Sequence, residues 1–282
     1  PETVTRSNEI LEKARPTPLT LREIETYRII DSISKSIHLE NIITNTFNFA
    51  FGSLPVSIFD LEVFNMVRFN KFEGARLSLA LSTNEKVAGW FSLGGYYGYG
   101  IDDEEDKYGG KITFNLLKDR DFKLRFVFNN TYKEVGRENV DDLNFVFPGQ
   151  LTRNFLGSRY DRLQEIKGEI SARPMTSLVL SASVSAGAWQ PKYNYFYIDS
   201  ILRKFRADEL TLSFRYAPGE QTISFFGKRF VTTPGNPIFE VKFRQGLNSF
   251  SDTSLVFSKI EAALSVSLYK GQIGHSQLRV TA

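Results

Sequence analysis

Strict alternation between apolar and polar residues constrains this chain more than any other feature. In residues 75–82 (ARLSLALS) every second side chain is apolar. Similar alternation recurs at 111–116, 122–128, 165–172, 178–188, 209–217 and 239–244. A period of two places successive side chains on opposite faces of a β-sheet. The sequence therefore predicts an all-β, antiparallel fold with roughly 11–13 visible strands after residue 42.

Alternation alone fits two architectures: a soluble β-sandwich with one wet face, and a transmembrane β-barrel with an apolar outside and a polar lumen. Strand length favours the barrel. The predicted strands at 165–172, 178–187 and 209–217 run about nine residues, which a tilted strand needs to cross hydrocarbon. Strands in globular proteins are commonly about five or six residues long.

Loop lengths also favour the barrel. Short turns are predicted at 118–121, 173–177 and 217–220, and longer loops at 135–160, 189–205 and 246–254. Outer-membrane barrels alternate tight turns on one side of the membrane with longer loops on the other. We predict an antiparallel transmembrane β-barrel over residues 42–282.

Aromatic residues supply a third argument. The chain has 25 Phe and 12 Tyr, and many of these rings fall near the ends of predicted strands. Tyr and Trp suit a membrane interface, because one end of each ring is wet and the other apolar. The predicted membrane-interface aromatics are Trp90, Phe91, Tyr96, Tyr97, Tyr99, Tyr193 and Tyr195.

The N-terminal segment, residues 1–41, follows a different pattern. Thr20 and Glu23 have the spacing of a capping box, and apolar residues then recur every three or four positions. This pattern predicts one amphipathic helix over residues 20–36. We expect it to pack against the end of the barrel; a plug or a docking helix is the alternative.

The polar face of the predicted strands carries charges of both signs. They are Arg76, Lys111, Lys123, Arg125, Glu165, Lys167, Glu169, Glu209, Arg215, Glu240, Lys242 and Arg244. If the apolar side chains face lipid, these charges face the lumen. We expect them to form an ion-pair network that fills the interior, because a pore more often shows one dominant sign. A small polar pore is the alternative.

Residues suited to catalysis or metal binding are sparse. The chain has no Cys and two His, His38 and His275, which excludes thiolate chemistry and weakens a histidine-based triad or metal site. The acidic run 102–106 (DDEED) lacks the ligand spacing of a calcium loop and is interpreted as a solvated turn. Scattered charges with a net value of +3 argue against nucleic acid as a partner. The sequence predicts no catalytic residue, metal or cofactor.

Several segments, taken in order, resemble one protein family. They are RFNKFEGAR at 68–76, GGYYGYG at 94–100, DKYG at 106–109, LTLSFRYAPG at 210–219, NPIFE at 236–240 and RQG at 244–246. They resemble a Bacteroidota family of uncharacterised outer-membrane β-barrel proteins that commonly follow a carboxypeptidase-regulatory-like domain. The resemblance spans roughly residues 15–280 and implies no established catalytic activity. It also implies that this chain is the barrel part of a longer protein with further C-terminal strands.

These observations lead to one functional expectation and two alternatives. We expect a non-enzymatic barrel in the bacterial outer membrane, acting as a structural or accessory subunit of an envelope assembly or transport complex. Its partners would be outer-membrane lipid and other envelope proteins. The main alternative is a small-solute channel or porin with a mixed-charge lumen. An outer-membrane enzyme, such as a lipid-modifying barrel, is weaker because such an enzyme usually needs a Ser/His/acid set.

Overall fold

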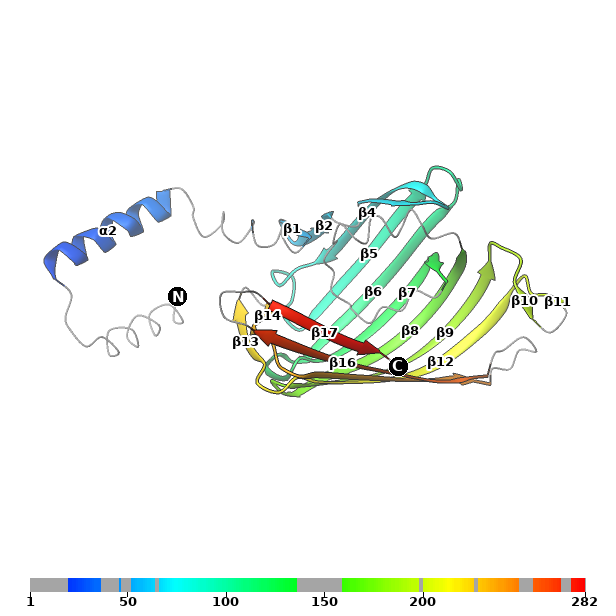
Figure 1. Cartoon of the computed structure of the whole chain (residues 1–282). Helices are drawn as coiled ribbons and strands as arrows, with labels where there is room; N and C mark the ends of the chain where they lie inside the picture. Colours follow the sequence, from blue (N-terminus) through cyan, green and yellow to red (C-terminus); the bar gives the residue numbers. More distant parts are fainter. Residues whose placement is uncertain are drawn as a thin grey trace. The chain divides into compact units, whose positions relative to one another are not determined.

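The structure is a computed structural model that divides into two compact units, Pro1–Phe47 and Asn48–Ala282 (Figure 1). It describes residues 20–36, 46, 52–63, 66–135, 159–197, 200–225, 228–248, 256–269 and 275–281. Within these residues, no helix is both long enough and apolar enough to cross a membrane. The unit boundary falls after Phe47, whereas the sequence suggested residue 41. The alternation around Phe47 and Phe49, and most of the predicted loops 135–160 and 246–254, lie outside the described residues.

The first unit contains helix α2 (Leu21–Ser36), at the position predicted from the sequence. Its N-terminus is a capping box. The backbone N–H of Thr20 donates to Glu23 Oε2 at 2.8 Å, and the backbone N–H of Glu23 donates to Thr20 Oγ1 at 3.4 Å. These bonds satisfy N–H groups that have no partner within the helix. The packing of α2 against the sheet stays a prediction.

The second unit is built on one antiparallel sheet of 13 strands (Figure 1). The strands are β1 (Ser53–Val56), β2 (Phe59–Glu62), β3 (Val67–Asn70), β4 (Gly74–Thr83), β5 (Phe91–Gly100), β6 (Asp106–Leu117), β7 (Phe122–Glu134), β8 (Tyr160–Met175), β9 (Leu178–Pro191), β12 (Phe205–Tyr216), β15 (Ile238–Leu247), β16 (Ser258–Tyr269) and β17 (His275–Thr281). Their order is β1-β2-β4-β5-β6-β7-β8-β9-β12-β15-β16-β17, and β3 also pairs with β4. The antiparallel all-β fold is confirmed.

Two short hairpins lie outside this sheet. Strands β10 (Phe196–Tyr197) and β11 (Ser200–Ile201) pair within the predicted loop 189–205. Strands β13 (Gln221–Phe225) and β14 (Lys228–Thr233) pair with each other. A three-residue 3-10 helix, η2 (Lys118–Arg120), forms the predicted turn between β6 and β7. Over the described residues the large sheet stays open, with β1 and β17 at its two edges, so barrel closure stays a prediction.

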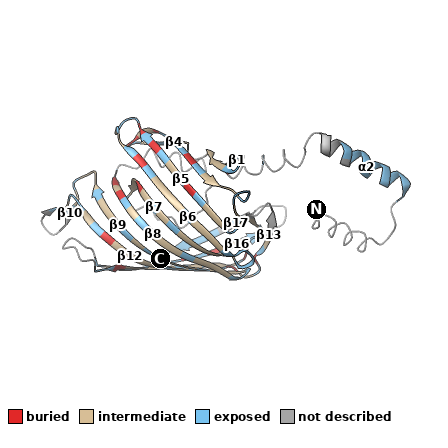
Figure 2. Cartoon of the chain, turned by 180° about the vertical axis from the view of Figure 1, so that it is seen from behind, coloured by how far each residue is buried: buried red, intermediate tan, exposed pale blue. Residues whose placement is uncertain are grey.

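The strand register separates an apolar face from a charged face. Leu79 lies opposite Tyr97, and Tyr97 opposite Tyr108, so these three residues share one face. The same register continues across the sheet to β17 and gives this face a row of exposed apolar side chains. They include Leu77, Leu79, Tyr97, Ile112, Phe126, Ile166, Val184, Leu212, Val241, Ile260 and Leu278. Exposed and more buried residues alternate along the strands in Figure 2.

The charged face is concave. In a flat sheet, strands β4 and β7 would lie roughly 14 Å apart, because neighbouring strands are about 4.8 Å apart. Arg76 on β4 nevertheless donates to Thr131 Oγ1 on β7 at 3.2 Å. The curvature visible in Figure 1 brings such distant strands together. As a result, the side chains that lie deepest among the described residues include charged ones, such as Lys107, Glu73 and Arg76.

Candidate functional site

The loop between β3 and β4 places one carboxylate over the charged face. The side-chain oxygen of Asn70 accepts hydrogen bonds from the backbone N–H groups of Phe72 (2.9 Å) and Glu73 (2.7 Å). An Asn that bonds its own backbone in this way holds a tight turn. Gly74 follows with a φ of +64°, a conformation that glycine adopts without strain. The turn thereby fixes Glu73, whose side chain also accepts a bond from Asn70.

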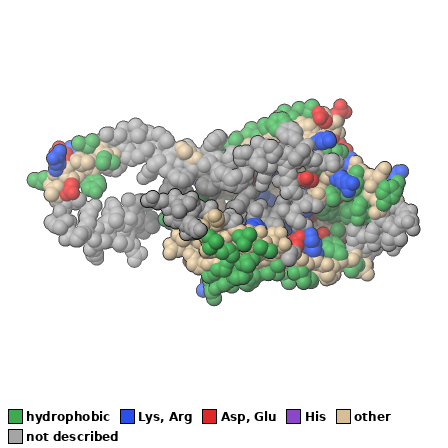
Figure 3. Space-filling view, in the orientation of Figure 1, with side chains coloured by type: hydrophobic (Ala, Val, Ile, Leu, Met, Phe, Trp, Pro, Cys, Tyr) green, Lys and Arg blue, Asp and Glu red, His purple; other side chains and the backbone are tan. Residues whose placement is uncertain are grey.

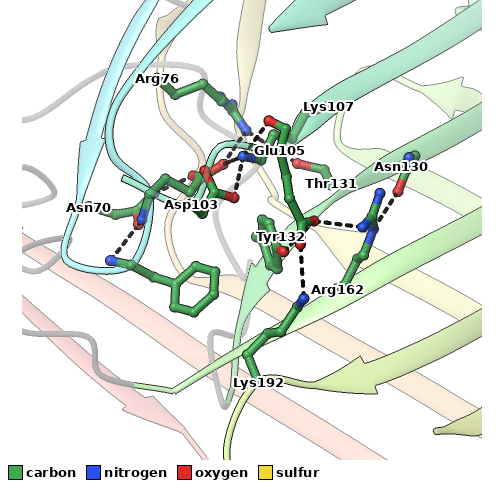
Figure 4. Close-up of polar contacts among 12 residues, drawn as sticks. Asn70, Arg76, Asp103, Glu105, Lys107, Asn130, Thr131, Tyr132, Arg162 and Lys192 are labelled. Atoms are coloured by element: carbon green, nitrogen blue, oxygen red, sulfur yellow. Dashed lines mark hydrogen bonds and ion pairs between the residues drawn. The ribbon is translucent and has the colours of Figure 1, made fainter. Parts of the chain in front are cut away.

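Four charged side chains form a buried cluster beneath this turn (Figure 4). Lys107 lies 3.4 Å from Glu73 Oε1 and forms an ion pair with Asp103. Arg76 Nη1 lies 3.5 Å from the same Glu73 oxygen. These side chains are between 1% and 5% exposed. Two positive and two negative charges therefore balance where solvent exposure is low, as buried charges require.

Glu105 joins a second group of side chains to this cluster. Its carboxylate accepts hydrogen bonds from Tyr132 (2.7 Å), Arg162 (2.6 Å) and Lys192 (3.1 Å). Burial by itself would raise the pKa of Glu105. The hydrogen bonds from Tyr132 and Lys192, and the positive charges of Lys192 and Arg162, outweigh burial and lower that pKa. The carboxylate is held ionised, and it connects the loop before β6 to strands β7, β8 and the end of β9.

Gly100 on β5 and Gly109 on β6 leave space for neighbouring side chains. A Cβ at Gly100 would overlap the Asp103 carboxylate and the Lys107 ammonium group. Gly109 lies opposite Tyr96, and a Cβ there would meet the Tyr96 ring at 2.5 Å and the backbone oxygen of Phe128 at 2.7 Å. The small residues thus sit where large polar side chains or an aromatic ring cover the strand.

A cavity of about 320 Å³ lies beside the cluster on the charged face. Arg68, Arg76 and Lys111 line it together with Ser78, Tyr96 and Glu62. Lys111 and Glu62 form an ion pair. The described part of the charged face therefore contains a small, polar, partly enclosed space.

A second charged cluster lies at the opposite ends of the strands. Glu220, whose side chain is fully buried, accepts hydrogen bonds from Arg173 (2.8 Å) and Arg215 (2.6 Å). Burial favours the neutral acid, but these two arginines outweigh it and lower the pKa of Glu220. Asp121 pairs with Arg229 at 2.9 Å and with Arg173 at 3.5 Å. The cluster ties the short turns after β6 and β12 to the concave face.

The register places all twelve charged residues of the predicted network on the concave face. Some pair with one another: Arg125 with Glu169 at 3.4 Å, Lys167 with Glu169 at 2.7 Å, and Arg215 with Glu240 at 4.0 Å. Others pair with residues outside the predicted set: Arg76 with Glu73, Lys111 with Glu62, Lys123 with Asp121 and Arg244 with Glu261. Glu165, Glu209 and Lys242 lie on the same face.

Sequence reasoning missed the most buried members of the clusters. Glu73 and Glu220 lie in turns, outside any alternating stretch, and Lys107 is the second residue of its strand. The acidic run 102–106 was interpreted as a solvated turn, which is wrong for Asp103: its side chain is 5% exposed and pairs with Lys107. Among the described residues, no group of three or more His, Cys, Asp or Glu is arranged to hold a metal ion.

The predicted interface aromatics divide between the two faces. Tyr97 and Tyr99 are exposed on the apolar face, and exposed Trp90 packs near Phe91 with ring centroids 5.7 Å apart. Tyr193 and Tyr195 contact each other edge to face at 6.2 Å beyond the end of β9. Tyr96 differs: it lies opposite Ala80 on the charged face and lines the cavity, so it is not part of the exposed aromatic set.

No protein-family model, curated protein or solved structure matches this chain.

Proposed function

We propose that this chain forms the wall of a β-barrel in the bacterial outer membrane and acts there as a structural or accessory subunit of an envelope complex. One observation carries the proposal: one face of the sheet carries exposed apolar side chains, and the opposite, concave face carries the charged side chains, several of which are buried. Figure 3 shows hydrophobic side chains gathered on part of the visible surface of the sheet. A soluble protein has the opposite arrangement, and a continuous exposed apolar surface requires an apolar neighbour. Lipid is such a neighbour.

Strand length supports a lipid neighbour over a protein one. Strands β6 to β9 have 12, 13, 16 and 14 residues, and β12 and β16 have 12 each. A strand tilted by about 45° needs roughly 9–11 residues to cross the hydrocarbon layer. Every one of these strands is long enough to cross and to extend beyond it.

The paired charges favour a filled interior over an open pore. The buried charges Glu73, Arg76, Asp103 and Lys107 neutralise one another, and Glu220 is bonded by two arginines. A pore lining that selects a class of solute more often shows a single dominant sign and wet charges. Because a filled barrel has no open pore, its function would depend on its surfaces. We therefore propose an accessory role without catalysis.

The proposal requires that the two edges of the sheet be covered. In lipid, the unpaired backbone groups of β1 and β17 would cost several kcal/mol each, so only closed sheets are stable there. We propose that further strands, from the same protein or from a partner subunit, complete the pairing. A partner strand at one edge would also explain a role within a complex.

Two measurements test this function. Purification from native membranes in mild detergent should recover the full chain with stable companion proteins, and planar-bilayer recordings should show no robust single channels. Regular single-channel currents would overturn the accessory role in favour of a small-solute channel. Recovery of the chain from the aqueous fraction, without lipid or detergent, would overturn the membrane location.

A further inference from the structure

The cavity beside the buried cluster contains hydrogen-bonding atoms without partners. Arg76 is 5% exposed, and its Nη1 atom is engaged by Glu73 and Thr131. Within the described part of the chain, neither Arg76 Nε nor Ser78 Oγ has a hydrogen-bond partner, although both atoms are buried. Leaving such a group unpaired is unfavourable, and more so when the group is charged. Both residues line the same cavity.

The lining of the cavity favours a negatively charged occupant. Arg68, Arg76 and Lys111 are basic, and Glu62 is the acidic residue among the lining side chains. The Glu62 carboxylate pairs with Lys111. Arg76 Nε carries a proton that can only be donated, so it requires an acceptor atom on the ligand. Among the described lining residues, a cation would face two arginines, and the Glu62 carboxylate is already paired with Lys111.

We infer that this cavity binds a small oxyanion, with the Nε–H of Arg76 and the hydroxyl of Ser78 donating to its oxygens. The volume of about 320 Å³ lies at the lower end of the range for small-molecule sites. A carboxylate and a phosphate group share the required chemistry, since each presents several acceptor oxygens to an arginine. The Tyr96 ring forms part of the wall and gives the site one aromatic surface.

The fold prepares this site before any ligand arrives. Thr131 accepts a bond from Arg76 and is also hydrogen-bonded to the Tyr96 side chain, so neither large side chain is free to collapse into the space. Gly98 lies opposite Ser78, and a Cβ there would overlap the Ser78 hydroxyl group. A preformed site of this kind loses little conformational entropy on binding.

Titration calorimetry of the purified full chain tests the inference, with inorganic phosphate and propionate as separate probes. We expect one saturable site for at least one of them, and the tighter probe identifies the source of the oxyanion. Ser78→Ala should weaken binding by about 3- to 10-fold, the loss of one hydrogen bond. Ser82→Ala is the matched control, because Ser82 lies on the same strand and face but outside the cavity lining.

Arg76→Lys keeps the charge but removes the Nε donor, and we expect it to weaken binding by about 10-fold or more. Its thermal unfolding is recorded alongside, since Arg76 also supports the cluster. If that variant does not fold, the comparison of Ser78→Ala with Ser82→Ala decides the question. Absence of saturable binding by either anion, or equal binding by wild type and Ser78→Ala, would mean that the cavity holds only water and would overturn the inference.

Discussion

Replacing Ile166 by arginine tests whether the apolar face of the sheet contacts lipid or water. Ile166 lies near the middle of β8 and its side chain is 65% exposed. In water, a substitution at so exposed a position changes the free energy of unfolding by about 0.5 kcal/mol or less. At the midplane of a bilayer, an arginine on the lipid face of a barrel costs about 2–4 kcal/mol.

Met175 provides a matched control on the same strand, because its side chain is 64% exposed. Met175 lies nine positions after Ile166, which is roughly 30 Å along the strand and roughly 23 Å along the membrane normal at a tilt of about 40°. The apolar band of a barrel is about 25 Å tall, so Met175 would lie beyond its edge. Met175→Arg should therefore cost about 0–1 kcal/mol.

The assay is equilibrium unfolding by denaturant of the full chain refolded into lipid vesicles, followed by the fluorescence of its two tryptophans. We expect the midpoint of Ile166→Arg to fall well below that of Met175→Arg, with unchanged slopes. Equal midpoints for the two variants would refute the assignment of the apolar face to lipid.

Three further predictions concern the charged face. Gly109→Ala should lower the free energy of unfolding by about 1–3 kcal/mol through overpacking. Gly110→Ala should be tolerated, because its Cβ would have its nearest neighbour at 3.7 Å. Denaturant unfolding of both variants measures the difference. Lys107→Met should lower the free energy of unfolding by about 3–5 kcal/mol, because it leaves buried carboxylates unpaired. Lys118→Met removes an exposed ion pair and should lower it by about 1 kcal/mol or less in the same measurement. Because the pKa of Glu105 is lowered in the folded state, its contribution to stability is complete above the ordinary carboxyl pKa and is lost as the pH falls through the lowered pKa, below about pH 4. Glu105→Gln should therefore reduce the decrease in thermal stability at acid pH. An unchanged decrease in the variant would contradict this prediction.

The alternating pattern was enough to predict most of the long strands and the face on which the charges within those alternating stretches lie. Arg76 and Lys111 follow the period of two, and the register places both on the concave face. The same rule applied strictly would also have separated Tyr96 from its neighbours Tyr97 and Tyr99. Strand β17 escaped prediction because its alternation is weak, with polar residues at most of its positions.

The clusters themselves could not be predicted from local pattern. Glu73, Asp103 and Lys107 come from a turn, a loop and a strand end, and they meet because the sheet curves. Curvature depends on which strands pair and in what register, which are long-range properties. Glycines at 94, 98, 100 and 109 lie where neighbouring side chains or backbone pack closely against the strand. Which groups occupy the space beside each glycine depends on the folded sheet and cannot be predicted from the local sequence.

The most direct test of the central claim uses the absence of cysteine from this chain. Single cysteines introduced at 165–170 in β8 would each carry a fluorophore, and quenching by brominated lipid would be measured in vesicles. If the apolar face contacts lipid, we expect strong quenching at Ile166, Gly168 and Ile170 and weak quenching at Glu165, Lys167 and Glu169. Uniform quenching, or quenching strongest at Glu165, Lys167 and Glu169, would contradict it.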